Sequence, residues 1–294
     1  MISNLLVRID INREKLSKGQ KKIAFYLEEH YDEAAFMTAA ALGNIVGVSE
    51  STVVRFATVI GYDGYPALQK AMQEMIRDKL TSIQRIEVTT GRIGDKDVVE
   101  SVLNQDIDKI KRTIDEVSRK DFNDAVDAII NADNIYIFGV KSASYIASFF
   151  GYYLDLIFGN VTMLNTTSKT TNFEKLFRIS DKDVMIGISF PRYSTMAVET
   201  MNFAKERGAH VICLTDSMIS PLVSISDSVL IARSDIASVV DTLVAPLSLI
   251  NALIVNIVIK KKEEIKNTFS QLEQVWKEQN VYADSDKNEG KNEQ

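Results

Sequence analysis

Hydroxyl and cationic side chains gather in two segments in the second half of this 294-residue chain. They are Lys141, Ser142 and Ser144 in the first segment and Ser189, Arg192 and Ser194 in the second. Each segment follows a short apolar run and precedes a helical pattern, so each is a loop that opens a helix. Hydroxyls, free backbone N–H groups and a guanidinium are suitable donors to a phosphate or a carboxylate. The alternative is that the hydroxyls only cap the helix N-termini.

A second group of polar side chains surrounds the start of a predicted helix at residues 50–60. It consists of Ser49, Ser51, Thr52 and Arg55. Hydroxyls and helix N–H groups hold the phosphate oxygens of DNA, and an arginine can bond guanine in two places. We therefore predict that these residues contact double-stranded DNA. The alternative is a helical bundle that binds protein, in which the serines and the arginine are incidental.

The stretch that carries this group, from Thr38 to Phe56, has the spacing of a helix-turn-helix. Ala41 is small where two helices cross closely, Gly47 permits the turn, and Val48 fills the gap between the helices. Residues 1–80 show no strand pattern and are expected to be all-helical. The predicted N-caps of three of their helices are Ser17, Thr38 and Ser49.

Charge is distributed unevenly along the chain. The whole chain has 34 Lys and Arg against 40 Asp and Glu, a net charge of -6, but residues 1–80 hold 10 basic and 10 acidic side chains. The excess acidity therefore belongs to the remainder, and a neutral N-terminal part is compatible with a local DNA-binding surface. Within that part, lysines crowd into residues 15–22, for which a solvated helix face is the alternative interpretation.

Cysteine and histidine are scarce, with one Cys and two His in the whole chain. Cys213 has no partner for an internal disulfide, and together with His30 and His210 it makes a poor zinc set, because structural zinc takes four N or S ligands. We expect no metal and no cofactor. Catalysis by a Cys/His pair is also disfavoured.

Neither a signal peptide nor a membrane span is expected. The apolar start of the chain is short and is followed at once by Arg8 and Asp10. The longest apolar run, residues 249–259, is interrupted by Asn251 and Asn256 and falls short of the ~20 residues that a span requires. It is interpreted as a buried helix, and the expected location is the cytoplasm, with no membrane partner.

The remaining sequence divides into a linker, an α/β domain and a tail. Residues 81–106 are predicted to form the linker, since polar residues and glycines interrupt its first part. From there to residue 282, five short apolar runs alternate with helical patterns, at residues 135–138, 161–164, 184–188, 211–214 and 229–231. This pattern predicts a doubly wound α/β domain with a five-stranded parallel sheet covered on both faces. Residues 283–294 are predicted to be a disordered tail.

The N-terminal motifs resemble the DNA-binding domain of RpiR/MurR-type transcriptional regulators. The resemblance covers about residues 3–78 and rests on residues 16–24, on the helix-turn-helix at 38–56 and on the Ile60-Gly-Tyr-Asp-Gly-Tyr65 segment, which occur in the family's order. It implies that Lys18, Lys21 and Lys22 lie on or near the side that faces DNA. We accordingly add Lys18 and Lys22 to the predicted DNA-binding residues.

The second half resembles the SIS (sugar isomerase) domain that such regulators carry, from about residue 107 to 282. The residues that carry this resemblance are Ile137–Val140, Asp183–Ser189, Ala204–Ser217, Ser220–Leu222 and Ser226–Asp227. The resemblance implies a doubly wound domain that dimerises and holds a phosphorylated sugar in the two loops described above.

This sequence departs from the family pattern in both loops. Where the first loop usually reads Gly-x-Ser, this chain has Lys141-Ser-Ala143, so a glycine becomes a cation and a hydroxyl is lost. Where the second usually reads Ser-x-Ser-Gly-x-Thr, this chain has Ser189-Phe-Pro191-Arg192-Tyr-Ser194. The two cations either pair with the charge of a phosphate or fill the pocket and alter the ligand.

These observations predict a homodimeric or homotetrameric transcription factor. It binds an operator in double-stranded DNA, and a phosphorylated sugar controls its DNA affinity. Another anionic metabolite and a ligand-free dimerisation domain are the alternatives for the second half. A sugar-phosphate isomerase or lyase is a further alternative, but the candidate bases Glu174, Asp216 and His210 are scattered and form no assembled acid/base pair.

Overall fold

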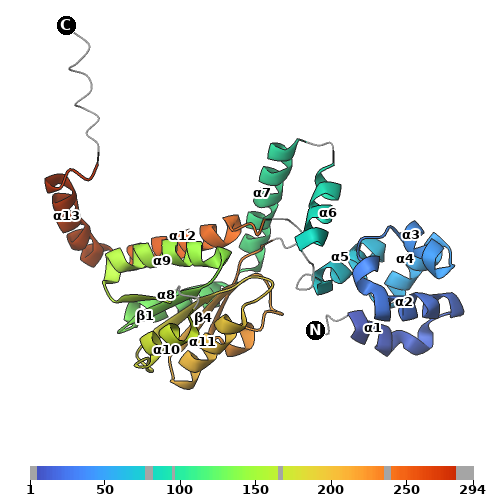
Figure 1. Ribbon diagram of the computed structural model, residues 1–294, viewed down its shortest axis with the longest axis horizontal. Coiled ribbons are helices and arrows are strands. Elements are labelled where there is room, and N and C mark those ends of the chain that lie inside the picture. The colour runs from blue at the N-terminus through green and yellow to red at the C-terminus, as the bar shows by residue number, and fades with distance from the viewer. Residues whose placement is uncertain (1–4, 77–81, 95–96, 165–167, 235–239, 283–294) are drawn as a thin grey trace, which may run out of the picture. The chain divides into compact units, whose positions relative to one another are not determined.

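The computed structural model describes residues 5–76, 82–94, 97–164, 168–234 and 240–282 (Figure 1). The chain forms two compact units, one comprising residues 1–95 and 236–240 and the other comprising residues 96–235 and 241–294. The predicted fold class is confirmed, because a helical N-terminal region precedes an α/β region with a five-stranded parallel sheet. The predicted tail at 283–294 lies outside the described residues.

The first unit is helical throughout its described residues. Its elements are α1 (Leu5–Asn12), η1 (Arg13–Lys15), α2 (Lys18–Ala34), α3 (Ala39–Val46), α4 (Glu50–Val59), α5 (Gly64–Ile76) and α6 (Ser82–Ile93). Fully buried Leu27, Leu42, Phe56 and Leu68 join α2, α3, α4 and α5 in one core. Helices this short are marginal alone, so this shared apolar core supplies most of their stability.

Polar side chains fix where the three central helices begin. Ser17 and Gln20 form a reciprocal capping box at the start of α2, in which the Gln20 side chain accepts the Ser17 N–H at 2.9 Å. Thr38 accepts the Ala41 N–H at 3.1 Å, and Ser49 accepts the Thr52 N–H at 3.3 Å. All three N-caps predicted from the sequence are confirmed.

Two glycines shape the turn between α3 and α4. Gly47 ends α3 in the left-handed conformation, with φ 72°, which a glycine adopts without steric cost. At Gly43 a Cβ atom would lie 2.8 Å from the Val48 carbonyl oxygen, closer than real Cβ contacts. Gly43 therefore makes a close approach that was not predicted, and Ala41, where the sequence placed one, is half-buried.

The segment expected to be a linker, residues 81–106, contains all of α6 and the first turns of α7 (Val98–Glu116). Polar composition and glycines suggested that residues 81–96 are interrupted, but residues 82–93 form α6. The helical pattern predicted from Asp97 to Val117 is confirmed by α7, which Asp97 caps by accepting the Glu100 N–H at 2.8 Å. Helix α5 begins at Gly64, so Pro66 lies in its first turn, where a proline is tolerated.

The second unit is a parallel sheet between two layers of helices (Figure 1). Its strands are β1 (Ile135–Gly139), β2 (Val161–Leu164), β3 (Val184–Ile188), β4 (His210–Thr215) and β5 (Ser228–Ile231). Its remaining elements are α8 (Arg119–Asn131), α9 (Ser142–Phe158), α10 (Lys169–Leu176), α11 (Thr195–Glu206), η2 (Val223–Ile225), α12 (Val244–Lys260) and α13 (Lys262–Glu278).

Alternate residues of each strand enter separate cores on the two faces of the sheet. Ile135 and Ile137 of β1 pack in the core that includes α8, α9 and α12, whereas Tyr136 and Phe138 pack in the core that includes α10 and α11. Every residue of β1 and β3 is buried. Burial on both faces explains why these strands read as continuous apolar runs rather than as an alternating pattern.

The strand order β2-β1-β3-β4-β5 places the functional loops. After β1 the chain adds β2 on one side, and it then returns to add β3 on the other side, so β1 and β3 are neighbours with Gly139 opposite Ile188. The loops that leave their carboxyl ends therefore diverge at a topological switch point, where ligands bind in sheets of this type.

Within the described residues, no single helix is long and apolar enough to span a membrane. Helices α12 and α13 reach that length and apolarity only as a pair, and they are bent by 102° at Lys261. The α12 helix packs Leu249, Ile250, Leu253 and Ile257 into the protein core, as expected for this segment. Pro246 lies in its first turn, where a proline is tolerated.

The contact at Gly43 leads to a stability prediction. Gly43→Ala would force a Cβ atom against the Val48 carbonyl and should destabilise the N-terminal unit by about 1–3 kcal/mol, the usual cost of overpacking. Urea unfolding followed by circular dichroism measures the change. The exposed neighbour Asn44 provides the control, since Asn44→Ala should alter stability by at most about 0.5 kcal/mol. Equal stabilities for the two variants would contradict this packing.

Candidate functional sites

The start of α4 gathers three hydroxyls and one guanidinium. The Ser49 hydroxyl lies 2.8 Å from that of Thr52 and 3.0 Å from that of Ser51. Arg55, one turn later, donates from Nε to the Ser51 carbonyl at 3.1 Å and from Nη2 to the Ser51 hydroxyl at 3.3 Å. The guanidinium is thus held beside the hydroxyls on an exposed surface at the positive end of the helix dipole.

The first turn of α2 lies against this surface. A Cβ atom at Gly19 would be 3.4 Å from Val48 and 3.5 Å from Thr52, so α2 and α4 approach closely there. Lys18 directly precedes Gly19 and Lys22 follows it by one turn, and both lysines are exposed. The close packing at Gly19 was not predicted, although a glycine inside a helical pattern is a signal of such packing.

In the second unit, the loops after β1 and β3 line one cavity. Its walls are formed by Val140, Lys141, Ser142, Ala143, Ser189, Phe190, Pro191, Arg192, Ser194 and Asp241. The structure therefore brings together the predicted residues of both loops, with one exception. Ser144 does not line the cavity, and its hydroxyl donates to the Lys141 carbonyl at 2.6 Å. Asp241 was not predicted; it accepts a hydrogen bond from the Ser142 hydroxyl at 3.3 Å.

The serines that line the cavity do not serve as side-chain helix caps. Lys141 is the N-cap of α9 and Ser194 is the N-cap of α11, and neither makes a side-chain capping bond. Ser189 is buried and accepts the Ser194 N–H at 3.4 Å, which fixes the second loop close to β3. The hydroxyls of Ser142 and Ser194 thus lie beside the cavity at the N-termini of two helices, where backbone N–H groups favour an anion.

Lys141 and Arg192 adopt backbone conformations that favour glycine. Lys141 has φ 55° and ψ -132°, and Arg192 has φ 59°. Such conformations cost a residue with a Cβ atom about 1–3 kcal/mol. These are the two positions at which the sequence departs from the family's glycines. The loop shape that glycine permits is retained, and a cation is present at each position.

The two cations are also without counter-charges. Among the residues that the structure describes, neither the Lys141 ammonium nor the Arg192 guanidinium forms an ion pair. The described cavity wall contains a single carboxylate, that of Asp241. The wall is therefore net positive, which suits an anionic ligand.

The proposed bases of an isomerase lie away from this cavity wall. His210 pairs with the Ser228 hydroxyl at 3.0 Å, Glu174 is exposed on α10, and Asp216 is buried beyond the wall. Burial also raises the pKa of the Cys213 thiol to about 11, so it is protonated at neutral pH. None of these four side chains lines the cavity.

Comparison with known proteins supports both halves of this description. Residues 3–79 match the model of the helix-turn-helix domain of the rpiR family, and residues 128–256 match the SIS domain. The chain belongs to the RpiR family of helix-turn-helix transcriptional regulators. Its two halves are the two domains that the sequence resemblance implied.

Relatives within the family are similar along most of the chain. The HTH-type transcriptional regulator HexR of Escherichia coli is 26% identical over 223 residues, which cover 73% of each chain. An HTH-type transcriptional regulator of Caldanaerobacter subterraneus is 25% identical over 274 residues, covering 90% of this chain and 94% of the relative.

Two solved structures share the fold. The sugar isomerase domain of an RpiR transcription factor from Sphaerobacter thermophilus has a TM-score of 0.58 and 26% identity, covering 60% of this chain and 98% of that domain. The Vibrio vulnificus NanR protein complexed with ManNAc-6P has a TM-score of 0.58 and 23% identity, covering 96% of this chain and all of that protein.

The positive φ angles yield a prediction in which stability and binding change in opposite directions. Lys141→Gly and Arg192→Gly should each stabilise the second unit by about 1 kcal/mol, because glycine relieves the backbone strain. Each should also weaken the thermal stabilisation that phosphate gives, because a cation leaves the cavity wall. Differential scanning fluorimetry with and without phosphate measures both effects.

Asn280 is the matched control because it has φ 48° and is not part of the cavity wall. Asn280→Gly should leave the response to phosphate unchanged. If a Lys141→Gly or Arg192→Gly variant keeps the full phosphate response, the cation that it lacks does not contribute to phosphate binding.

Proposed function

We propose that this RpiR-family regulator binds operator DNA through α4 and the first turn of α2, and that a phosphorylated sugar in the cavity between the β1 and β3 loops controls its DNA affinity. The observation that carries the ligand half is the convergence of the two loops at the switch point of the sheet, with two cations that form no ion pair with any described residue. Membership in a family of transcriptional regulators supports the DNA half.

On DNA, the residues proposed to act are those at the exposed start of α4. Arg55 reads base edges or a phosphate, and the Ser49, Ser51 and Thr52 hydroxyls bond phosphate oxygens. The Arg55 guanidinium already donates hydrogen bonds to Ser51, so DNA binding would exchange these bonds for bonds to a base or a phosphate. Lys18 and Lys22 add phosphate contacts from α2. Two such units in a homodimer or homotetramer would address symmetric half-sites.

In the cavity, the phosphate group is proposed to accept hydrogen bonds from the hydroxyls of Ser142, Ser189 and Ser194. The Lys141 and Arg192 cations balance its charge. The solved structure of NanR, which carries ManNAc-6P, shows that a protein of this fold takes a phosphosugar. Asp241, which also lines the cavity, is the proposed acceptor for a sugar hydroxyl.

We further propose that this protein senses its ligand without converting it. Isomerisation of a sugar needs a base positioned beside the carbon that loses its proton. In the described cavity wall the carboxylate of Asp241 is bonded to Ser142, and the bases considered from the sequence lie elsewhere. The relatives that align over most of the chain are named as transcriptional regulators.

The ligand proposal is tested with a panel of sugar phosphates and their unphosphorylated counterparts. At least one sugar phosphate should stabilise the protein and change its affinity for DNA from the region upstream of its own gene by about 5–150-fold, the usual range of allosteric coupling. The counterpart without phosphate should do neither. Fluorescence anisotropy with labelled DNA measures the affinity, and no response to any member of the panel would contradict the proposal.

The DNA proposal is tested with Arg55→Ala. Loss of one two-point contact to a base should cost about 1–3 kcal/mol, which is a loss of roughly 5–150-fold in specific DNA affinity. Arg13→Ala is the matched control, because it also removes one exposed positive charge from the same unit. Equal DNA affinities for the two variants would exclude Arg55 from the interface.

A further inference from the structure

The cavity is connected to α7 by polar contacts that neither the sequence motifs nor the family comparison assigns. The first contact begins at Tyr193, which lies between Arg192 and Ser194 in the second cavity loop. Its hydroxyl donates to Asp216 Oδ1 at 2.8 Å. Asp216 directly follows β4 and is fully buried. Asp216 does not line the cavity, but it is hydrogen-bonded to the loop after β3, which does.

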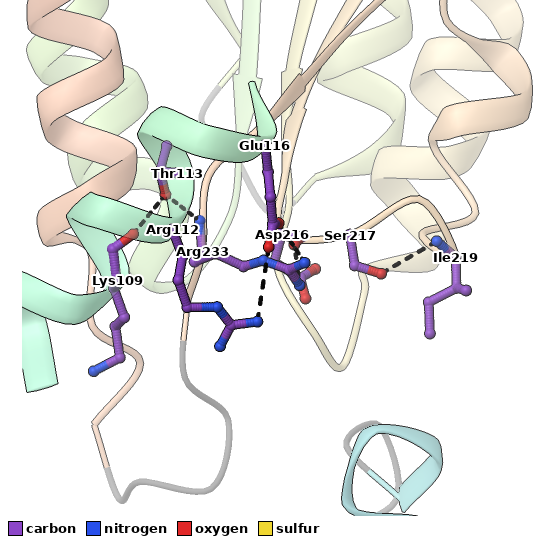
Figure 2. A network of polar contacts seen from close by, with 8 residues as sticks. All are labelled: Lys109, Arg112, Thr113, Glu116, Asp216, Ser217, Ile219 and Arg233. Carbon is purple, nitrogen blue, oxygen red and sulfur yellow. Dashed lines mark hydrogen bonds and ion pairs between the residues drawn. The ribbon is translucent and has the colours of Figure 1, made fainter. Parts of the chain in front are cut away.

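Arg233 continues this connection to α7 (Figure 2). Its Nη1 donates to the Asp216 carbonyl at 3.4 Å, and its Nη2 forms an ion pair with Glu116 at the end of α7. Its backbone N–H donates to the Thr113 hydroxyl at 2.9 Å, and that hydroxyl donates to the Lys109 carbonyl at 2.8 Å. Arg233 therefore joins the segment after β4 to the last turns of α7.

A second connection starts from the other side of the cavity. Asp241 lines the cavity and is bonded to Ser142. The next residue, Thr242, donates from its hydroxyl to Asp106 Oδ1 of α7 at 2.8 Å. Asp106 also pairs with Lys109 at 3.3 Å. The cavity is thus linked to α7 at two places that are separate in the sequence.

Both connections end on the same face of α7. The residues involved are Asp106, Lys109, Thr113 and Glu116, which we term the α7 seam. Their spacing of three, four and three residues is that of one side of a helix. This side of α7 contacts Arg233 and Thr242, which both follow β5.

The α7 seam is polar although much of it is shielded from water. The side chains of Asp106 and Lys109 are 16% and 12% exposed, and that of Arg233 is 20% exposed. Apolar residues of similar volume often stabilise such positions as well or better, so stability alone does not explain the charges. Hydrogen-bonded networks of this kind have discrete alternative pairings, a property that packed switching elements use.

We propose that the α7 seam transmits the occupancy of the cavity to α7, with Tyr193 and Thr242 as its two positioning residues. This inference rests on the proposed function of the cavity. An anion at Arg192 and Ser194 changes the loop that holds Tyr193, and an anion near Ser142 changes the pairing of Asp241 beside Thr242. Both changes alter the partners available to the seam.

The position of α7 in the chain explains how the seam could affect DNA binding. It is the first element of the second unit, and the chain enters it from the unit that contains the DNA-binding helices. A shift of α7 therefore moves the point at which the DNA-binding unit is attached. The seam supplies polar contacts through which ligand binding can favour one position of α7 over another.

The test uses the full-length double variant Tyr193→Phe/Thr242→Val, which removes two hydroxyls at nearly constant volume. The probe is inorganic phosphate, compared with sodium chloride at equal ionic strength. Fluorimetry measures phosphate binding, and hydrogen–deuterium exchange measures the protection of the α7 amides. Tyr152→Phe/Thr268→Val is the matched control, because both residues are exposed and neither belongs to the seam.

In the wild type and the control, phosphate should change the exchange of α7 amides by about fivefold or more. In the double variant phosphate should bind with a midpoint close to that of the wild type, but the change in α7 exchange should be largely lost. Each single variant should lose part of it. An α7 response that persists in the double variant, or is absent from a wild type that binds phosphate, overturns the role of the seam.

The outcomes distinguish the two proposals. If the wild type shows no phosphate binding, the proposed function of the cavity fails and the inference about the seam fails with it. If phosphate binds to the wild type and the double variant alike and α7 responds in both, the cavity proposal stands and only the seam is excluded.

Discussion

The burial of β1 and β3 on both faces is the constraint on which the second unit depends. Side chains on neither face of these strands are free to bind a ligand, because both faces are covered by helices and filled by separate cores. Polar chemistry is therefore confined to the ends of the strands. The reversal of strand order at β1 then separates the two loops just enough to leave a cavity between them.

Strain in these loops is concentrated where the cations are. Lys141 and Arg192 keep conformations that glycine would adopt more readily, and the surrounding strands and helices must stabilise them. Gly139 contributes from inside β1, where a Cβ atom would lie 2.8 Å from Ala143 and Ala147 of α9. The first loop is therefore held tightly at both of its ends, which limits the ways in which it can respond to a bound anion. A tightly held loop transmits displacement to its neighbours rather than absorbing it.

The DNA-binding unit follows the same logic on a smaller scale. Its glycines at positions 19 and 43 permit helices to approach so closely that the polar start of α4 lies beside the first turn of α2. The apolar core fixes this arrangement, and the functional side chains remain exposed. In both units, glycines determine where the candidate binding side chains lie. The α7 seam differs, because it places polar residues between packed elements.

Much of the protein was determined by local sequence. Apolar runs of three to five residues identified all five strands, and Ser17, Thr38 and Ser49 marked the starts of three helices, because strand burial and capping depend on residues that are close in sequence. The helix-turn-helix and the two candidate anion-binding loops were also predicted from the sequence. Helix α6 was not predicted, because the glycine and threonines of residues 82–93 were interpreted as helix breakers. These residue types disfavour a helix too weakly to prevent one.

Only the tertiary structure decided which of these residues meet. It joined the two loops into one cavity, excluded Ser144 from its wall and added Asp241, which is about a hundred residues from Ser142 in the sequence. It also revealed that Lys141 and Arg192 have positive φ angles and that the cavity is linked to α7 through Arg233. The reason is physical: strand order, close helix approach and backbone strain arise from contacts between distant segments, and no local pattern of residues encodes their geometry.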